Sequence, residues 1–291
     1  MGWRVVAVKS RSKLDFKMNY LVCRTDSSVS KVYIDEIDIL IIESTAVSLT
    51  AVLLNKLIDR NIKVIFCDDK RNPSAELTPY YGCHDTSLKI RNQVKWSDLS
   101  KALVWTEIVR KKVENQRDIL KKYGFKQSDI IDGYLFDFEL NDSTNREGHA
   151  AKVYFNALYG QSFSRNRENN INSALNYGYA LILSAVNREI TALGYITQLG
   201  IFHRSMFNEF NLGSDIMEPL RGIIDSEVYR MNLENFTSYE KDILKAILTK
   251  EVSLNGKKYI FTNAISIYVK SILDALDESN LDLIRFIDYE L

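Results

Sequence analysis

Two glutamates and one histidine in the second half of the chain are the residues that could do chemistry. They are Glu147, His203 and Glu218. Carboxylate oxygens and an imidazole nitrogen can together hold Mg²⁺ or Mn²⁺ and leave positions open for water and phosphate oxygens. A metal ion bound in this way polarises phosphorus and stabilises the leaving oxygen. The chemistry that these residues predict is therefore phosphodiester chemistry.

Each of the three residues also has a purely structural explanation. Their separations along the chain match no self-contained metal motif. Glu147 is expected in the first turn of a helix, where any acid interacts favourably with the helix dipole. Asp215 followed by Glu218 has the form of a capping box. His203, after Ile201-Phe202, could be a hydrogen-bonded histidine at the end of an apolar segment. The residues alone leave both explanations open.

Basic residues lie around these acids in the sequence, and most of them are arginine. Between residues 144 and 221 they include Arg146, Lys152, Arg165, Arg167, Arg188 and Arg204. Arginine suits bidentate contact with phosphate, but it also suits the neutralisation of nearby acids. A second basic group could bind phosphate, although basic residues grouped in this way more commonly lie on a solvent-exposed face of a helix. It comprises Arg110, Lys111, Lys112, Arg117, Lys121 and Lys122.

Other polar residues are weaker candidates. Asp68-Asp69, at the end of an expected strand, could form an acidic site, but a solvated turn is the more common role of such a pair. His84 and His149 are expected to be structural or exposed. His149 stands two residues from Glu147, which on a helix directs it to a different face. It is therefore a poor second ligand.

Composition restricts the kind of protein. The chain has 291 residues, 46% of them apolar and 26% charged, which favours two folded domains. Its 38 basic and 38 acidic residues give a formal net charge of zero, so bulk charge gives no reason to expect nucleic acid or an anionic membrane as a partner. Three widely separated cysteines, no signal peptide and no apolar run of membrane-spanning length predict a soluble protein of the reducing cytoplasm.

The first part of the chain has the pattern of a small β domain. Short apolar segments predict the strands Trp3–Val8, Leu14–Arg24, Val29–Ile34, Ile37–Ile42 and Lys63–Cys67. From Thr45 to Arg60 apolar residues recur at helical spacing, so one helix is expected among the strands. Pro73 and Pro79 interrupt any regular element there, and the domain boundary is expected near residue 82.

The periodicity then becomes helical. Ser97 is the expected N-cap of a helix that runs to Gly124. Ser143 and Asn170 are expected caps of two further helices, and the later helical segments are Thr144–Leu158, Ile171–Leu193, Ser214 or Asp215 to Met231, Tyr239–Leu248 and Thr262–Leu276. Asn255-Gly256 predicts a hairpin. The prediction is an α+β protein with a β-rich domain over 1–82, a linker over 83–96 and a helical domain over 97–291 that carries the hairpin.

Several segments are similar to those of a known family. Asn145 to Gly160, Asn176-Tyr177-Gly178-Tyr179 and Ser214 to Arg221 resemble the CRISPR adaptation integrase, the first-numbered Cas protein, in its type II form. Phe66 to Arg71 and Tyr80 to His84 look like the same subtype. The resemblance covers essentially the whole chain, including a matching length, an N-terminal β domain and a helical C-terminal domain.

The resemblance implies a catalytic metal site. Glu147, His203 and Glu218 occupy the three metal-ligand positions of the family, for Mg²⁺ or Mn²⁺, and Asp215 occupies the adjacent acidic position. In several relatives the third ligand is aspartate, so a glutamate at 218 changes its reach by one methylene. The implied reaction is a transesterification in which the 3′ hydroxyl of captured foreign DNA attacks a phosphodiester at the end of a CRISPR repeat.

The resemblance also implies partners. The chain would form a homodimer through its N-terminal domain, and would assemble with the small second-numbered Cas adaptation protein on double-stranded DNA. Candidate contacts with that DNA are Arg146, Arg165, Arg167 and Arg204. Two other functions stay open: a metal-dependent DNA nuclease that does not integrate, which would use the same ligands, and a non-catalytic DNA-binding scaffold, which would not need them.

Overall fold

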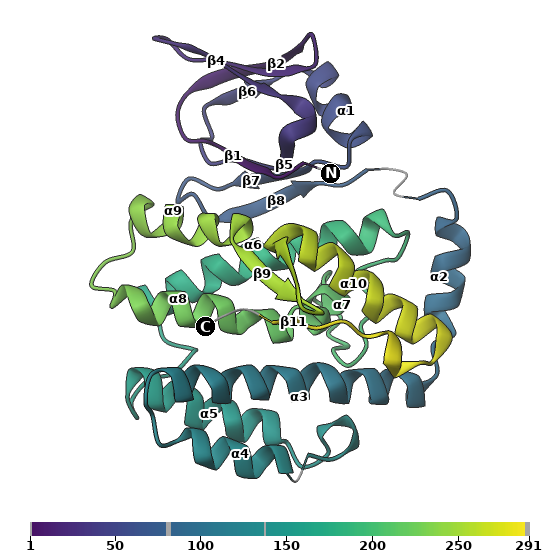
Figure 1. Cartoon of the computed structure of the whole chain (residues 1–291). Coiled ribbons are helices and arrows are strands. Elements are labelled where there is room, and N and C mark those ends of the chain that lie inside the picture. Colours follow the sequence, from purple (N-terminus) through teal and green to yellow (C-terminus); the bar gives the residue numbers. More distant parts are fainter. Residues whose placement is uncertain (1, 80–82, 137, 289–291) are drawn as a thin grey trace.

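The computed structural model describes residues 2–79, 83–136 and 138–288. An N-terminal part of strands stands on a larger, mostly helical C-terminal part (Figure 1), as expected for the α+β class. The boundary expected near residue 82 lies outside the described residues. The expected linker, 83–96, contains a helix, α2 (Thr86–Val94), which runs along one side of the molecule toward α3 (Asp98–Lys122) (Figure 1).

The N-terminal part consists of two four-stranded sheets and one helix within the described residues. One sheet has the order β1-β5-β7-β8, and its strands are Arg4–Val8, Ile37–Ile42, Lys63–Cys67 and Pro73–Leu77. The other has the order β4-β3-β2-β6, and its strands are Val29–Tyr33, Tyr20–Arg24, Ser12–Lys17 and Val47–Leu49. Helix α1 (Ala51–Asp59) packs between them, because its buried Leu53 and Leu57 share an apolar cluster with both sheets.

Two segments of this part differ from the sequence prediction. Leu14–Arg24 is not one strand but the hairpin β2–β3, because Met18 and Asn19 turn the chain with φ of 51° and 64°. The expected helix over Thr45–Arg60 begins only at Ala51. The Thr50 side chain accepts a hydrogen bond from the Leu53 amide and caps α1, so the preceding residues are free to form β6.

The interpretation of Pro73 as a residue that interrupts regular structure was wrong. Pro73 is the first residue of β8, which pairs antiparallel with β7. β8 is an edge strand of its sheet, so a residue without a backbone N–H is tolerated at its start.

The C-terminal part is a helical assembly with one small sheet. Its helices after α3 are α4 (Ser128–Phe136), α5 (Arg146–Tyr159), α6 (Asn170–Ala192), α7 (Asn211–Ile216), α8 (Arg221–Met231), α9 (Ser238–Ala246) and α10 (Phe261–Glu278). The sheet has the order β10-β9-β11 and comprises Lys257–Ile260, Glu251–Leu254 and Ile287–Asp288. β9 and β10 join through Asn255 and Gly256, whose φ angles are 52° and 73°. α4 and β11 were not expected.

Helix caps decide where the site helices begin. The Ser97 side chain accepts from the Ser100 amide and starts α3, as predicted. Asn169, not Asn170, caps α6 in the same way. The expected cap Ser143 does not start α5. Instead the Asp142 carboxylate accepts from the amides of Arg146 and Glu147, at 2.7 and 3.0 Å.

The helix expected from Ser214 or Asp215 to Met231 is divided. α7 ends at Ile216, a 3₁₀ turn covers Glu218–Leu220, and α8 follows. Pro219 cannot donate the backbone hydrogen bond that a continuous α-helix would need at that position. The division places Glu218 at a bend between two helices.

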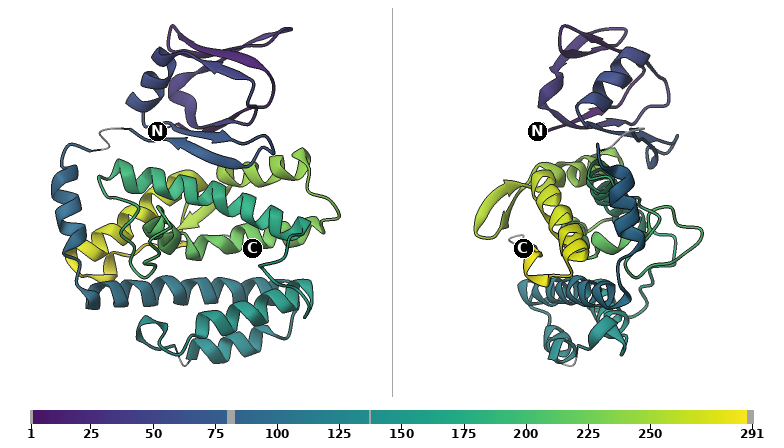
Figure 2. Two further views of the ribbon diagram at one scale, coloured as in Figure 1. Left: turned by 180° about the vertical axis from the view of Figure 1, so that it is seen from behind. Right: turned by 90° about the vertical axis from the view of Figure 1, so that its right-hand side faces the viewer.

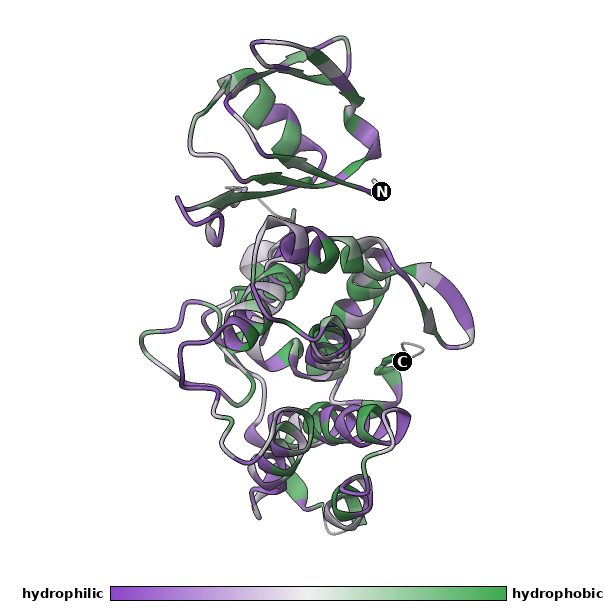
Figure 3. Cartoon of the chain, turned by 90° about the vertical axis from the view of Figure 1, so that its left-hand side faces the viewer, coloured by the Kyte–Doolittle hydropathy of each residue, from purple (hydrophilic) through white to green (hydrophobic). Residues whose placement is uncertain are grey.

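The two parts share a core because strand β5 is buried on both faces. All six residues of Ile37–Ile42 are buried. Ile39 and Ile41 belong to the apolar cluster of the helical part, whereas Leu40 and Ile42 belong to that of the N-terminal part. Side chains of a strand alternate between faces, so the apolar residues Ile39 to Ile42 serve two cores. The sheet that faces the helices is correspondingly hydrophobic in Figure 3, and Figure 2 shows it lying across them.

Buried ion pairs cross the same contact. The Arg188 guanidinium of α6 lies 2.6 Å from Asp38 of β5, and both side chains are buried. Lys245 of α9 pairs with the buried Glu43 after β5. Arg188 therefore neutralises acids at the contact between the two parts and does not lie beside Glu147. No helix among the described residues is long and apolar enough to cross a membrane.

Gly178 lets α6 and α8 approach closely. A Cβ atom at this position would lie 2.5 Å from Ile224 Cγ2 of α8, which is well inside contact distance. We expect Gly178→Ala to lower the free energy of unfolding by about 1–3 kcal/mol, because the added methyl overfills a packed core. Denaturant unfolding measures the change.

A matched control is Gly133→Ala in α4, where a Cβ would meet nothing within 4 Å. This change should be neutral or stabilising by up to about 1 kcal/mol, because alanine is the better helix former. Equal effects at the two positions would contradict the packing role of Gly178.

Candidate active site

Three charged side chains from three separate segments meet beside α3, and a histidine from a fourth segment lies against the same helix. Lys112 comes from the middle of α3, and Glu147 from the first turn of α5. His203 lies in the loop between α6 and α7, and Glu218 at the bend between α7 and α8. The charges of Glu147 and Glu218 both act on His203, so the tertiary structure brings the three predicted ligands into one region. Lys112, which the sequence analysis had counted in a basic group, contacts the two glutamates.

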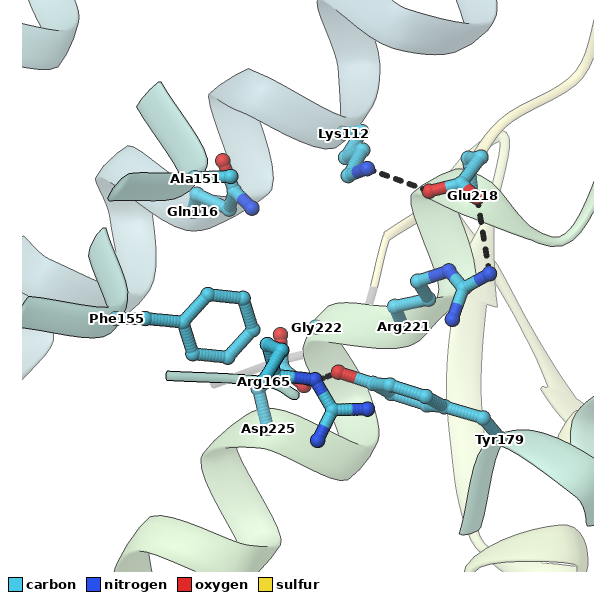
Figure 4. Close-up of a pocket in the computed structure, with 10 residues that line it drawn as sticks. All are labelled: Lys112, Gln116, Ala151, Phe155, Arg165, Tyr179, Glu218, Arg221, Gly222 and Asp225. Atoms are coloured by element: carbon cyan, nitrogen blue, oxygen red, sulfur yellow. Dashed lines mark hydrogen bonds and ion pairs between the residues drawn. The ribbon is translucent and has the colours of Figure 1, made fainter. Parts of the chain in front are cut away.

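The ammonium of Lys112 lies between the two glutamates. Its Nζ forms an ion pair with Glu147 and another with Glu218 Oε2, the latter at 2.6 Å. Figure 4 shows Lys112 pointing at Glu218. Burial acts to lower the pKa of Lys112, but Glu218 and Glu147 together raise it above its ordinary value. Lys112 is therefore a cation in direct contact with two of the candidate ligands.

Glu218 is buried and ionised. Its second oxygen lies 3.0 Å from the guanidinium of Arg221, one turn further along the chain (Figure 4). Burial opposes ionisation, but Arg221 and Lys112 overcome it and lower the pKa of Glu218 to about 2. The carboxylate is thus available as an anionic ligand at any physiological pH.

Asp215 fixes the position of His203. The Asp215 carboxylate is fully buried and accepts from the amides of Ile201 and Phe202 at 2.6 and 2.9 Å. It also binds the Nδ1 atom of the His203 ring. Because Nδ1 faces Asp215, a metal would have to bind Nε2, and a carboxylate behind a histidine is the usual support of a metal-binding imidazole. The capping-box interpretation of Asp215 with Glu218 was wrong, because Asp215 binds this loop.

Packing around the loop holds it in place. A Cβ atom at Gly200 would lie 2.5 Å from the His203 carbonyl oxygen and 2.7 Å from Asp215 Oδ2, so only glycine allows this approach. Phe202 stacks on Trp105 of α3 with ring centroids 4.5 Å apart, and the His203 ring meets the edge of Trp105 at 5.7 Å. His203 is half-exposed, and its ring is hydrogen-bonded to Asp215 after Ile201-Phe202, as its structural explanation expected. That hydrogen bond leaves the ligand role of its other ring nitrogen open.

The predicted ligand atoms do not form a closed cluster in this structure. Within the described part of the chain, the group of histidine, cysteine and acidic ligand atoms that lie within 4.8 Å of one another is Cys83, His84 and Asp85, at the start of α2. Glu147, His203 and Glu218 are not such a group, and the ammonium of Lys112 lies between the two carboxylates. Their assignment as metal ligands stays a prediction.

A cationic pocket of about 220 Å³, whose lining also includes the acids Glu218 and Asp225, opens beside Lys112 (Figure 4). Lys112, Arg165 and Arg221 line it, and the guanidinium of Arg165 lies 5.4 Å from the ring centroid of Tyr179. Burial raises the pKa of the lining carboxyl Asp225 to about 6. Three cations around a space of this size suit the binding of a phosphate group.

The four arginines proposed for DNA contact occupy different places. Arg165 lines the pocket, and Arg146 lies over the Tyr134 ring at 5.5 Å. Arg167 is exposed. Arg204 is 75% exposed and lines a wider pocket of about 750 Å³ together with His203. They do not form one cluster, although each is at least partly open to a pocket or to solvent.

Sequence reasoning missed Lys112 and Arg221. Lys112 belonged to a group that could bind phosphate but that more commonly indicates a solvated helix face, and its side chain is only 13% exposed. One signal was present: Ile108, Lys112 and Gln116 recur at intervals of four, which places them on one face of α3, and Ile108 is fully buried. A lysine on a buried helix face indicates a buried acidic partner.

Asp68 and His149, two of the weaker candidates, have the turn-forming and exposed positions that the sequence analysis expected. The Asp68 carboxylate accepts from the amides of Lys70 and Asn72, at 2.9 and 2.8 Å, and so stabilises a turn. His149 is exposed on α5, close to the ring of Tyr134.

The His203–Asp215 contact predicts a specific pH dependence. Its hydrogen bond with Asp215 raises the pKa of His203 above the ordinary value of 6.5. The pair therefore stabilises the fold below the ordinary histidine pKa, and this stabilisation is lost as pH rises through the folded-state pKa.

In an NMR titration with chelator present we expect the pKa of His203 to lie above the ordinary histidine value, and Asp215→Asn to lower the pKa of His203. Signals of His84 and His149 are internal references; an unchanged His203 would contradict the contact.

The sequence matches a known family over most of its length. Residues 5–254 match the model of the family described as CRISPR associated protein Cas1. One similar relative is the CRISPR-associated endonuclease Cas1 of Neisseria meningitidis serogroup C (strain 8013). It is 34% identical over 253 residues, which cover 86% of this chain and 80% of the relative.

Solved structures share the fold. A casposase bound to integration product has a TM-score of 0.76 at 20% identity, with 98% of this chain and 93% of that chain covered. A chain of a Cas6-RT-Cas1–Cas2 complex has a TM-score of 0.74 at 14% identity, with 99% of this chain and 36% of that chain covered. The match over residues 5–254 and the identity with the Neisseria endonuclease lead to one conclusion: the chain belongs to the Cas1 family.

Proposed function

We propose that this chain is a divalent-metal-dependent integrase of CRISPR adaptation, of the type II form, that joins the 3′ ends of captured DNA to a CRISPR repeat. The observation that carries the proposal is the meeting of Glu147 and Glu218 on one buried cation, beside a pocket lined by arginines. Membership of the Cas1 family, the Neisseria relative and the fold of the casposase support it.

The donor set fits a hard divalent ion. Glu147 and Glu218 offer carboxylate oxygens, and His203 offers a ring nitrogen whose orientation Asp215 fixes. These ligand types suit Mg²⁺ and Mn²⁺. When bound, such an ion would offset the charge that develops on the attacked phosphate and on the leaving oxygen.

The chain's own residues would prepare the reactants. Arg221 and Lys112 keep Glu218 ionised, and Asp215 holds His203 in one orientation. Arg165 and Arg221 would bind phosphate oxygens in the pocket and hold the strand beside the ligands.

The reaction exchanges one phosphodiester for another. The 3′ oxygen of the captured strand bonds to phosphorus and loses its proton, and the bond from phosphorus to the 3′ oxygen of the repeat junction breaks. That leaving oxygen takes up a proton. Because one phosphodiester is formed for each one broken, the chemistry needs no nucleotide hydrolysis.

The assembly would supply most of the DNA surface. A chain with zero formal net charge has little long-range attraction for DNA by itself. The similar structure that contains Cas1 and Cas2 supports the second-numbered Cas protein as a partner. The homodimer, the double-stranded DNA ligand and the cytoplasmic location stay predictions.

A nuclease that does not integrate is the second candidate, favoured by the description of the Neisseria relative as an endonuclease. Incubation with a supercoiled plasmid that carries a repeat separates the two. Integration gives plasmid joined to a duplex with 3′-hydroxyl ends, and nothing joined when those ends are 3′-deoxy. A nuclease gives nicks with both duplexes.

We expect Glu147→Gln, His203→Ala and Glu218→Gln each to reduce joining by at least about a hundredfold, because each removes several kcal/mol of charge stabilisation. Joining is measured with the partner protein in Mg²⁺ and in Mn²⁺, and thermal unfolding checks that each variant folds. Glu251→Gln, in an exposed position of the hairpin, is the control and should join normally. Near-normal joining by folded His203→Ala would reject its role as a ligand, and full activity of all three variants would favour a scaffold.

We expect DNA affinity to depend on assembly and on salt. The chain alone should bind a short duplex weakly, and the partner-bound assembly should bind it more tightly, with affinity falling steeply as salt rises. Arg165→Ala, Arg167→Ala or Arg204→Ala should each reduce the slope of log affinity against log salt by about one unit per lost phosphate contact. Titrations at several salt concentrations measure this. Equal affinity with and without the partner would contradict the assembly account.

A further inference from the structure

Lys112 occupies the position between two carboxylates where a shared cation would stand. Its Nζ contacts both Glu147 and Glu218, and its side chain is 13% exposed. Two positive centres cannot both contact the same pair of oxygens at short range, because their charges repel and their volumes overlap. Any divalent ion that binds these same two oxygens, Glu147 Oε1 and Glu218 Oε2, must therefore displace this ammonium.

We infer that Lys112 is an internal competitor of the divalent ion, and that bound DNA releases it. The inference rests on the proposed function, because it takes Glu147 and Glu218 as metal ligands. In the free protein the ammonium holds the two carboxylates and weakens metal binding. When a phosphate of DNA enters the adjacent pocket, the ammonium gains an alternative anionic partner and leaves the carboxylates to the metal.

Neutralisation of the glutamates does not depend on this lysine alone. Glu218 already has Arg221 at 3.0 Å, and Glu147 is 27% exposed, so that water can solvate it. A lysine placed to bridge the two carboxylates is thus more than charge balance. The charged groups that face it are Glu147 of α5, Glu218 of the bend and Arg221 of α8.

The side chain of Lys112 has an adjacent pocket into which its ammonium can move. Lys112 lines the pocket of about 220 Å³ that Gln116, Arg165 and Arg221 also line, and Figure 4 shows its chain entering between Gln116 and Glu218. A lysine has a flexible four-carbon stem and a compact charge, so a change of rotamer can carry the ammonium from the carboxylates toward the pocket. A phosphate there would meet two arginines and this lysine.

The inference predicts coupled binding of metal and DNA. If DNA raises metal affinity by some factor, metal raises DNA affinity by the same factor. The test is binding of Mn²⁺ itself, measured from the free Mn²⁺ signal in electron paramagnetic resonance, with and without a 3′-deoxy duplex that lacks the repeat, so that no turnover occurs.

Without DNA, Lys112→Met should bind Mn²⁺ about 10- to 100-fold more tightly than the wild type, the range by which groups next to a metal site alter affinity. DNA should then strengthen Mn²⁺ binding much less in this variant than in the wild type. Lys112→Arg keeps a cation and should retain the weak binding of the wild type. Lys111→Met removes the same charge from the adjacent residue of α3, which pairs with Asp288, and should also bind like the wild type.

Circular dichroism in chelator checks folding, and Lys112→Gln is measured in parallel as a second neutral variant. Unchanged or weaker Mn²⁺ binding in the folded neutral variants would overturn the inference. Equally tighter Mn²⁺ binding in Lys111→Met would overturn it as well, because the effect would then come from the loss of any positive charge on α3.

Glu147→Gln separates this failure from failure of the proposed function. If the wild type binds Mn²⁺ and Glu147→Gln does not, the metal site stands whatever Lys112 does; if the two proteins bind alike, the metal site itself is wrong.

Discussion

One ammonium group between two carboxylates is the constraint on which the candidate site depends. Lys112 belongs to the long helix α3, Glu147 to α5, and Glu218 to the bend before α8. A buried carboxylate is costly unless it is paired, so these contacts favour one arrangement of the three elements. The same contacts keep Glu218 anionic. The contacts of Lys112 therefore both stabilise the packing of these three elements and keep the site anionic at Glu218.

A second polar cluster positions the histidine by different means. Asp215 is fully buried, yet its oxygens are satisfied by loop amides and by the His203 ring, so its burial is tolerated. Gly200 provides the close approach that this loop requires. Asp215 thus holds one side of the histidine, and the half-exposed ring lines a wide pocket together with Arg204. A ligand of an open metal site must be held rigidly by its neighbours and must keep its metal-binding atom accessible.

The N-terminal part is joined to this site through a strand that serves two cores. β5 gives Ile39 and Ile41 to the helices and Leu40 and Ile42 to its own sheets. Arg188, paired with Asp38, adds a buried ionic contact from α6. The two parts therefore pack as one body, and a surface formed on the N-terminal sheets keeps a defined direction relative to the cationic pocket.

Local pattern by itself determined the α+β class, the extent of α3 from the Ser97 cap, and the strand Ile37–Ile42. It also placed Glu147, His203 and Glu218 as candidates, although only the resemblance to a family distinguished a site from ordinary caps. Alternation, helical period and capping depend on neighbours in sequence, which is why they could be read there. Only the tertiary structure decided that Lys112 is buried between the glutamates and that Asp215 supports His203. Those contacts join residues far apart in the chain, and they follow from how the helices pack on one another, which no local periodicity specifies.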